Sequence, residues 1–464
     1  MDDKMATSKQ KDFILTGRIF PVLMSVSAPL MFNNLVRTFY TMADGLFLAQ
    51  LSAEDFAASS FSWPLNFLFI SIGLGIGVAA TALLSHYIGA KQHERLQRYV
   101  DNTRTLNVTF GLGLALVGYL LSPVMLKWMG GSGVFLDKAN IYLQISFIGL
   151  ALDFGFFTYQ AILNAQGQTK IMTTLSAISM VINILLDPFF IYDHLAWFNL
   201  PGLGWGIAGA AWATVISKGV LLVMTSVYVN RRSPIRPVIR RLSFDRATSH
   251  HILNLALPSA LGYGGSSLGF TVMNALITSY GTNTLAAFSM VNRISDIVTQ
   301  PQMGVGMALT SLVGQNMGAG FIDRAKQIFK QAIQFILIIS ILSSAVILLF
   351  QKPILSIFIK QTADSDLWLQ AQEYLAYTAF IIFFMGLFSA LNGFFQGCGQ
   401  TKYSMFMTIA RLWIIRVPLV FILRYWTGLG STGIWISMLA SNLLIVVWGF
   451  VIYWRNDWGE LAKL

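Results

Sequence analysis

The chain has 464 residues, of which 55% are hydrophobic and only 11% are charged, and its mean hydropathy is +0.63. Soluble domains carry roughly 25% charged residues, so this composition excludes a water-soluble globular protein. The net charge of +11 comes from basic residues that lie in the gaps between apolar runs. This layout predicts membrane topology signals and argues against nucleic-acid binding.

Twelve apolar runs follow one another along the chain in two sets of six, and each is long enough to cross a bilayer as a helix. The first set lies near residues 19–44, 56–86, 104–123, 139–163, 171–192 and 205–229. The second set lies near 251–280, 285–316, 328–350, 371–395, 403–425 and 431–454. We therefore predict an all-α membrane protein with twelve transmembrane helices in two pseudo-symmetric six-helix lobes around a central cavity.

The charged gaps divide the chain into five segments. A cytoplasmic N-terminal segment covers 1–18, and the first six-helix lobe covers 19–229. A basic cytoplasmic linker follows at 230–249, then the second lobe at 250–455 and a cytoplasmic tail at 456–464. With both termini inside, 21 of the 31 Lys and Arg residues lie on cytoplasmic segments and five lie on outer loops. This distribution follows the positive-inside rule and predicts a multi-pass protein of the cell membrane.

The two halves of the chain are copies of one another. A shift of 229 positions places Pro29 on Pro258, Gly75 on Gly304 and Gly89 on Gly318. Six spans separate the copies, which is an even number, so both halves have the same orientation in the membrane. The halves are therefore parallel repeats related by an axis along the membrane normal, with a cavity between them.

Several motifs within these repeats resemble those of one family. They are Pro29 followed by Asp44, the runs NAQGQTK at 164–170 and NILLDP at 183–188, GIAGAAWAT at 206–214, and GQNMGAG at 314–320. In these motifs the chain resembles the multidrug and toxic compound extrusion (MATE) transporters, in particular their DinF-like branch. The resemblance covers nearly the whole chain. It implies a secondary active exporter that exchanges amphipathic or cationic organic compounds for H⁺ or Na⁺.

Four acids lie at membrane depth, where an ionisable side chain is costly and is a functional-site hypothesis by default: Asp44, Asp153, Asp187 and Asp296. Asp44 stands within an apolar run, and pairing with Arg37 is its alternative interpretation. Asp187 has Asn183 one turn earlier on the same helix face. The proline that follows Asp187 interrupts the helical ladder, and a purely structural polar kink is the alternative there.

The repeats differ at these acids, which favours the functional interpretation. The position that matches Asp44 in the second half is Met273, and Val417 with Pro418 stands where the first half has Asp187 and a proline. A requirement of the fold would have appeared in both copies. We therefore predict that the coupling site belongs to the first lobe alone.

The resemblance implies the same site and extends it. In the MATE family the matching cation site uses Asp44, Asn183, Asp187 and Thr214, with the backbone carbonyl of Ala210. All of these groups are oxygen donors. Two carboxylates close together in a low dielectric need a bound positive charge, so the set suits a proton or Na⁺, and no other cofactor is expected. The acids that another branch of the family places in its seventh and tenth spans are missing, since 255–279 has none and Glu373 lies at the outer edge.

Other polar residues in the spans have weaker assignments. Tyr142 and Gln160 resemble polar members of the family's drug pocket, although packing or helix-to-helix hydrogen bonds explain them equally well. Arg293 and Asp296 lie three residues apart and are expected to pair on one helix face, with a substrate contact of Arg293 as the alternative. Asp153 has no assigned role.

Several other functions lack the residues that they need. Cys398 is the only cysteine, which makes a cysteine-based metal or redox site improbable. Glycines 73, 75 and 77 lie within a span, so helix packing explains them better than nucleotide binding. His250 and His251 have no nearby ligand set, and no phosphate-binding loop with a Gly-Lys-Ser/Thr ending is present. We therefore do not expect an enzyme or a metal site beyond Na⁺.

The predicted mechanism is alternating access, in which the two lobes rock about the cavity and the first helix bends at Pro29. The expected partners are small amphipathic drugs and the lipid bilayer, with no nucleic acid, and the chain is expected to be a monomer. The nearest alternative is a lipid-linked oligosaccharide flippase, which would place several cationic residues in its cavity. An ion channel is a weaker alternative, because the chain has no filter-like loop.

The basic linker yields a first prediction. It carries six arginines and one acid, Asp245, and we interpret it as a topology element, with an anionic-lipid site as the alternative. Arg240→Ala and Arg241→Ala should leave drug export mostly intact, measured as drug resistance of cells with the inserted protein quantified. Near-complete loss of export in a correctly inserted variant would contradict this interpretation.

Overall fold

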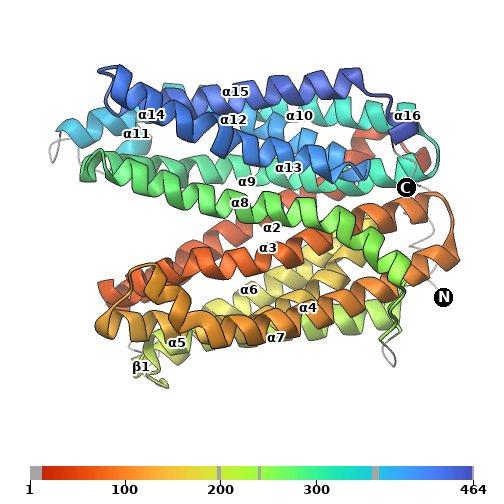
Figure 1. Cartoon of the computed structure of the whole chain (residues 1–464), viewed down its shortest axis with the longest axis horizontal. Helices are drawn as coiled ribbons and strands as arrows, with labels where there is room; N and C mark the ends of the chain where they lie inside the picture. The colour runs from red at the N-terminus through yellow and green to blue at the C-terminus, as the bar shows by residue number, and fades with distance from the viewer. Residues whose placement is uncertain (1–12, 196–199, 239–241, 358–364, 462–464) are drawn as a thin grey trace.

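The computed structural model describes residues 13–195, 200–238, 242–357 and 365–461, and all statements on its structure refer to them (Figure 1). Arg240 and Arg241 lie outside the described residues. The first lobe comprises α2 (Ile19–Leu51), α3 (Ala53–Gly89), α4 (His93–Trp128), α5 (Gly133–Ala165), α6 (Thr169–Ile191) and α7 (Gly206–Arg232). The second lobe comprises α8 (Arg246–Thr278), α9 (Thr282–Gly318), α10 (Ile322–Leu349), α12 (Ser365–Gly397), α13 (Thr401–Ile409) continued by η1 (Ala410–Arg416) and α14 (Val417–Trp426), and α15 (Thr432–Arg455).

The prediction of an all-α membrane protein is confirmed. Ten described segments are long and apolar enough to cross a membrane, counting α13 to α14 as one. The other two, α8 and α9, have 33 and 37 residues but a more polar composition. The remaining described elements are short: α11 (Gln351–Ser356), α16 (Trp458–Leu461) and a hairpin of β1 (His194–Leu195) with β2 (Leu200–Pro201) between α6 and α7. The hairpin is a small addition to the predicted all-helical chain.

The linker is shorter than predicted, because helices extend into it from both sides. α7 continues to Arg232, and α8 begins at Arg246 with Asp245 as its N-cap. The Asp245 carboxylate accepts hydrogen bonds from the hydroxyl and the backbone N–H (3.0 Å) of Thr248. These bonds favour the charged form and hold the pKa of Asp245 below its ordinary value. The capped end fixes where α8 enters the second lobe.

The two lobes exchange helices. The first half of α2 packs into the apolar core of α9, α10 and α12, through Val22, Leu23, Val26 and Leu30. Leu48, near the other end of α2, belongs to the core of the first lobe. Reciprocally, Ile252, Leu255 and Ala256 of α8 lie in the first lobe's core, and Met273 and Ile277 lie in the second's. Each crossing helix therefore belongs to both lobes.

Matching glycines allow the crossing helices to approach their partners closely. A Cβ on Gly75 of α3 would lie 2.6 Å from the Ala256 carbonyl oxygen of α8. A Cβ on Gly304 of α9 would likewise lie 2.6 Å from the Met31 nitrogen of α2. Small residues are the usual device for close helix packing in lipid. The repeat seen in the sequence thus corresponds to a repeated packing contact.

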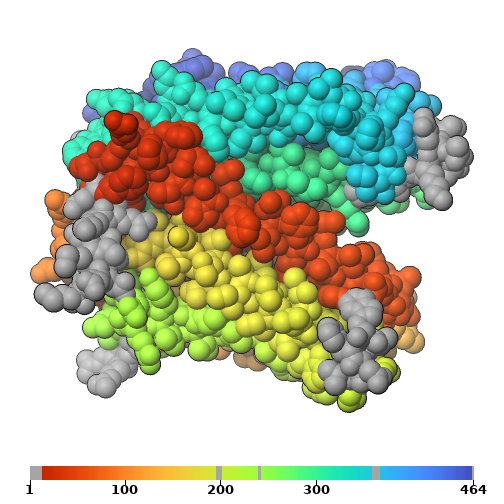
Figure 2. Space-filling view, turned by 180° about the vertical axis from the view of Figure 1, so that it is seen from behind, coloured from red at the N-terminus to blue at the C-terminus, as the bar shows by residue number. Residues whose placement is uncertain are grey.

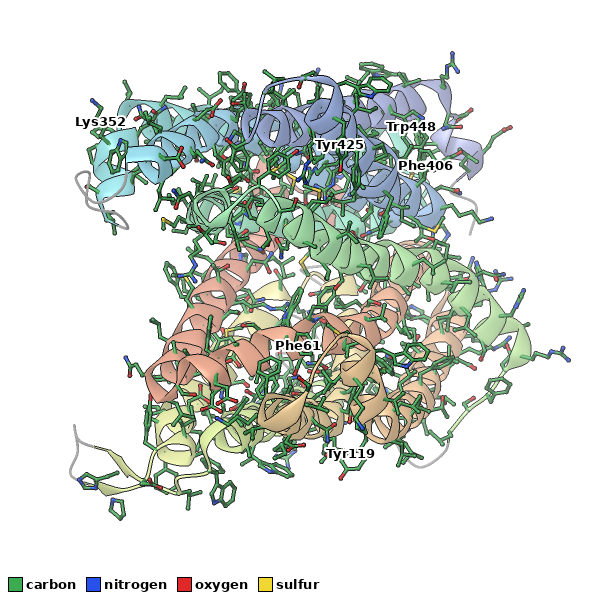
Figure 3. All side chains as sticks on the ribbon, turned by 60° about the vertical axis from the view of Figure 1, so that its left-hand side comes forward. Phe61, Tyr119, Lys352, Phe406, Tyr425 and Trp448 are labelled. Carbon is green, nitrogen blue, oxygen red and sulfur yellow. The ribbon has the colours of Figure 1, made fainter. Side chains whose placement is uncertain are left out.

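The lobes meet at one end and separate at the other. We call the end where α2 begins and α15 ends the inner end. There, Ser311 Oγ donates to the Asn164 carbonyl (2.6 Å) and Gln315 Nε2 donates to the Ala165 carbonyl (2.6 Å). Figure 2 shows a wedge-shaped cleft between the lobes that opens at the opposite, outer end. Figure 3 shows the same two lobes with their side chains, Phe61 and Tyr119 in the first and Phe406, Tyr425 and Trp448 in the second.

Closure at the inner end depends on two glycines, which gives a second prediction. A Cβ on Gly89 would lie 2.0 Å from the Gln315 carbonyl oxygen, and one on Gly318 would lie 2.0 Å from that of His86. Gly89→Val should therefore hold the inner ends apart and impair export. Distances between spin labels at the inner ends of α4 and α10 should lengthen. Gly113→Val is the matched control, because a Cβ there meets nothing within 4 Å; unchanged distances in Gly89→Val would contradict the prediction.

Candidate functional site

The centre of the site is a buried carboxylate on α6. Asp187 is 0% exposed, and its Oδ1 accepts a hydrogen bond from Asn183 Nδ2 at 3.0 Å. Pro188 follows without breaking the helix, which continues to Ile191. A proline has no backbone N–H to donate to the carbonyl four residues earlier, so the carbonyl of Ile184 loses its helical partner. The last two turns of α6 therefore present a carboxylate, an amide and a released carbonyl.

The second carboxylate comes from α2. Its charge and that of Asp187 on α6 lie close enough to act on one another. Asp44 is half-buried, and no ion pair with Arg37 is present in the described part of the chain. Among the described residues, neither carboxylate forms an ion pair with a Lys or Arg side chain. Such an arrangement favours uptake of a proton or a cation.

Two tyrosines complete the site. Tyr142 of α5 and Tyr40 of α2 both interact electrostatically with Asp44 and Asp187, and the Tyr40 phenol faces the Thr214 hydroxyl of α7. The sequence analysis missed Tyr40. It lies four residues before Asp44, and this spacing places the two side chains on one helix face. The same reasoning that joined Asn183 to Asp187 would have found it.

The donor set fits a hard monovalent cation or a proton. Thr214 Oγ1 donates to the Ala210 carbonyl at 3.1 Å, which leaves the hydroxyl lone pairs available. Among the described residues, three oxygens of the cluster are buried without a hydrogen-bond partner: Asp44 Oδ1, Asn183 Oδ1 and Asp187 Oδ2. Unpaired buried oxygens are costly, and a bound cation or proton would satisfy them. In the described ranges, no three His, Cys, Asp or Glu side chains are placed so that they could hold a metal ion together.

Several predicted residues lie elsewhere. Gln160 is 18 residues beyond Tyr142 on α5, about 27 Å along the helix axis, so it does not reach the carboxylates. Arg293 is exposed, and the expected ion pair with Asp296 does not form in the structure as described. That expectation was wrong because a spacing of three places two side chains on one face without bringing the charged ends together. Asp296 keeps no ionic partner.

Asp153 now has a structural explanation. Its Oδ2 lies 2.6 Å from Lys218 Nζ of α7, and both side chains are largely buried. The lysine falls inside the sixth apolar run, and an intramembrane cation is a signal that the sequence analysis did not use. A buried ion pair between α5 and α7 neutralises both charges in lipid. Asp153 therefore stabilises the first lobe and does not join the cation cluster.

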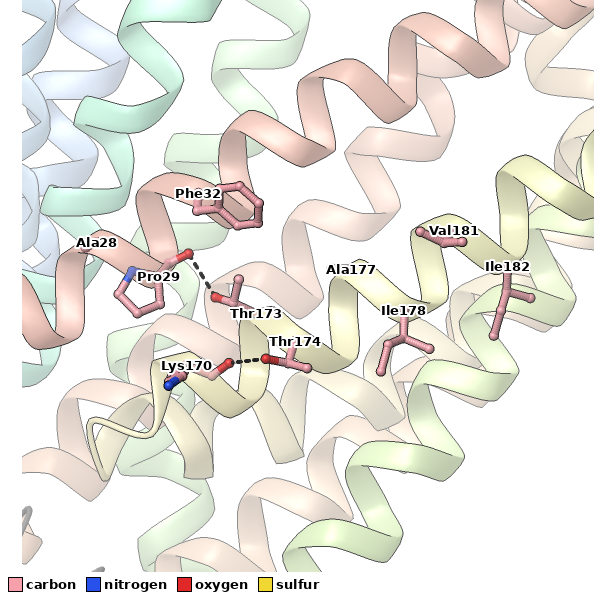
Figure 4. Close-up of a pocket in the computed structure, with 10 residues that line it drawn as sticks. All are labelled: Ala28, Pro29, Phe32, Lys170, Thr173, Thr174, Ala177, Ile178, Val181 and Ile182. Atoms are coloured by element: carbon pink, nitrogen blue, oxygen red, sulfur yellow. Dashed lines mark hydrogen bonds between the residues drawn. The ribbon is translucent and has the colours of Figure 1, made fainter.

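The proline of α2 is tied to the helix that carries Asp187. Thr169 and Thr173 of α6 donate to the carbonyls of Val26 (2.8 Å) and Pro29 (2.9 Å). Next to these bonds lies a groove of about 640 Å³ between α2 and α6 (Figure 4), with Phe32, Ile178 and Val181 on its apolar wall. Pro29 lies 15 residues before Asp44, roughly 22 Å along the helix. Bending at Pro29 would therefore displace Asp44 relative to α6.

The second lobe lacks a copy of this site. Met273, at the position that matches Asp44, is only 2% exposed and packs in the apolar core of its own lobe. Val417 stands in the other acid's place at the start of α14. Neither side chain offers an oxygen.

A family model and individual relatives both match this chain over most of its length. The model of the MatE family matches residues 29–189 and 258–422, two segments whose starts are separated by the repeat shift. The chain is 28% identical over 436 residues to the probable multidrug resistance protein YoeA of Bacillus subtilis, covering 92% of each. It is 24% identical over 448 residues to the FAD transporter of Shewanella oneidensis, covering 94% of this chain and 95% of that one.

Solved structures agree with the fold. The outward-facing conformation of a multidrug resistance MATE family transporter matches with a TM-score of 0.88 and 24% identity, covering 97% of this chain and 98% of that chain. At this identity the likeness shows the fold alone.

The cation cluster gives a third prediction. Asp44→Asn keeps the size of the side chain and removes its charge, so it should abolish drug-driven cation exchange. Met273→Asp is the matched experiment, because it places an acid at the corresponding position of the other lobe and should not create a second site. Cation flux in proteoliposomes measures both variants. Normal drug resistance from Asp44→Asn would contradict the assignment to the first lobe.

Proposed function

Because the chain belongs to the MatE family and forms a multi-pass membrane transporter, we propose that it exports amphipathic or cationic organic compounds in exchange for H⁺ or Na⁺. Its relatives support multidrug efflux as the class of transport. The exchange ion and the antiport mechanism are our proposal. We place the protein in the cell membrane as a monomer with both termini in the cytoplasm, and in the DinF-like branch of the family.

The observation that carries the proposal is the set of unpartnered oxygens around Asp44 and Asp187. Two adjacent carboxylates in a low-dielectric site repel one another unless a positive charge neutralises them. A proton on one carboxyl or a Na⁺ between the two would provide that charge. A cationic drug and the exchanged cation then compete for the same two carboxylates. An exchanger requires such competition.

The crossing helix supplies the link from binding to movement. The inner half of α2 is fixed in the second lobe's core, and its outer half carries Tyr40 and Asp44 against the first lobe. Cation uptake reduces the repulsion between Asp44 and Asp187, so the outer half of α2 moves toward α6 by bending at Pro29. This movement narrows the first lobe's side of the cleft and favours release of the drug.

A second candidate cargo is anionic. The relative from Shewanella oneidensis is named an FAD transporter, and FAD carries negatively charged phosphates. A cavity that accepts such a compound needs cationic groups in its wall. Arg411 and Arg416 lie within the eleventh span, and this observation favours an anionic cargo as the alternative.

The experiment that tests the exchange gives a fourth prediction. Proteoliposomes should export a fluorescent cationic dye when an inward H⁺ or Na⁺ gradient is imposed, and Asp187→Asn should lose this gradient dependence. Asp296→Asn makes the same chemical change at a membrane-depth acid outside the cluster and should retain export. Dye export that persists after both gradients are collapsed would contradict the exchange mechanism.

A further inference from the structure

Two arginines of the second lobe are buried at membrane depth. Arg411 and Arg416 are 4% and 3% exposed, in the middle of the span that runs from Thr401 to Trp426. Neither belongs to the cluster of Asp44 and Asp187. Buried charges in membrane proteins are expensive and mark functional sites by default.

A π-helical turn places the two side chains on one face. The span changes from α-helix to π-helix at Ala410–Arg416 and returns to α-helix at Val417. In a π-helix, residues five apart stack above one another, whereas in an α-helix they point roughly 140° apart. Arg411 and Arg416 are five apart. The turn therefore aims both guanidinium groups toward α12 and α15.

Their contacts are with neutral groups. Arg411 Nη1 lies 3.3 Å from Asn442 Oδ1 and 2.8 Å from the Met385 sulfur, and its guanidinium lies 4.3 Å from the centre of the Phe388 ring. Arg416 Nε donates to Ser441 Oγ at 2.9 Å. Arg411 Nε is buried and has no hydrogen-bond partner. The pair therefore has unused donor capacity.

No carboxylate balances this charge in the described part of the chain. The ion pairs found there join Lys138 to Glu54 and Asp55, and Lys218 to Asp153. Arg411 and Arg416 are moreover close enough to repel one another. Two buried like charges without a counter-charge are costly, and a well-packed apolar pair would avoid the cost. An anion bound between them would remove it.

The repeat relates the position of this pair to that of the cluster around Asp44 and Asp187. Gly433 and Ile434 of α15 repeat Gly206 and Ile207 of α7, and this shift of 227 places Ser441 on Thr214. Ser441 contacts Arg416, whereas Thr214 belongs to the site of Asp44 and Asp187. The second lobe thus has a cationic group next to the position that matches Asp187, since Arg416 directly precedes Val417.

We propose that Arg411 and Arg416 form a binding site for an oxyanion, the carboxylate or phosphate group of a transported compound. Guanidinium groups bind both kinds of oxyanion through paired, charge-assisted hydrogen bonds. Met385 and Phe388 of α12 border the site, and the flexible Met side chain can repack around a ligand. This proposal rests on the proposed function only in its assumption that the ligand is a transported compound.

The test is equilibrium binding, which does not require transport. Detergent-purified protein is titrated with pyrenebutyrate, an amphipathic carboxylate, and with the neutral pyrenebutanol of nearly equal size. The carboxylate should bind more tightly and raise the melting temperature. Arg411→Gln and Arg416→Gln should each weaken its binding about ten- to a hundredfold, and leave binding of the alcohol unchanged.

Matched variants keep the outcome interpretable. Arg424→Gln makes the same change at a half-buried arginine stacked on Tyr280, outside the proposed site, and should bind as wild type. Arg411→Lys and Arg416→Lys keep the charge if the Gln variants fold poorly, and should retain the preference for the carboxylate. Equal affinity of both pyrenes in wild type would overturn the site. Equal protection by chloride at the same ionic strength would overturn its assignment to oxyanion cargo.

Failure here is distinguishable from failure of the proposed exchange. Asp187→Asn should retain carboxylate binding while losing gradient-driven export, and the Gln variants should retain the gradient dependence of a cationic dye.

Discussion

The structure depends on two helices that each belong to both lobes. α2 and α8 are fixed at one half in the opposite lobe and at the other half in their own. Of the prolines that the repeat aligns, Pro258 lies between those halves, and Pro29 lies near the end of the half that packs in the second lobe, directly before Leu30. The lobes therefore cannot rock without bending these helices, and each proline marks a position where the helical ladder already lacks a bond. Gly75 and Gly304 fix the crossings closely enough that the bend is transmitted.

Duplication has preserved this scaffold without preserving the charges. The glycines, the prolines and the order of the helices appear twice. In the second lobe, however, the positions that correspond to Asp44 and Asp187 hold apolar residues. The second lobe instead carries arginines on a π-helical turn that the first lobe lacks. In lipid a charge is tolerated only where a partner or ligand compensates it. The two lobes thus use one architecture to bury opposite charges.

The sequence predicted the features that depend on spacing within one helix. Apolar runs located most helix bounds to within six residues, although α4 begins 11 residues before its predicted run and α2 ends seven residues after its own. The i, i+4 rule joined Asn183 to Asp187. Features that depend on the rotation of one helix against another could not be predicted in this way. Lys218 of α7 reaches Asp153 of α5, and in the described part of the chain Arg293 forms no ion pair with Asp296 despite a favourable spacing. The exchange of α2 and α8 between lobes leaves no periodic signal, because either lobe offers the same apolar surface. The π-helical turn changes which residues share a helix face. A prediction based on 3.6 residues per turn therefore places Arg411 and Arg416 on different faces.

The hydrogen bonds at the proline suggest how bending is possible inside a bilayer. An unsatisfied backbone carbonyl costs several kcal/mol in lipid, so a hinge that simply breaks bonds would be prohibitive. At α2 the carbonyls of Val26 and Pro29 accept from threonine hydroxyls of α6. The Thr173 hydroxyl can return to the Thr169 carbonyl, one turn earlier on its own helix, as Thr174 already does with Lys170. When α2 moves, the threonine hydroxyl then exchanges its hydrogen bond to α2 for one within α6. Thr169 and Thr173 precede Asn183 and Asp187 on the same helix, so the helix that carries the proposed cation site also holds α2 beside Pro29.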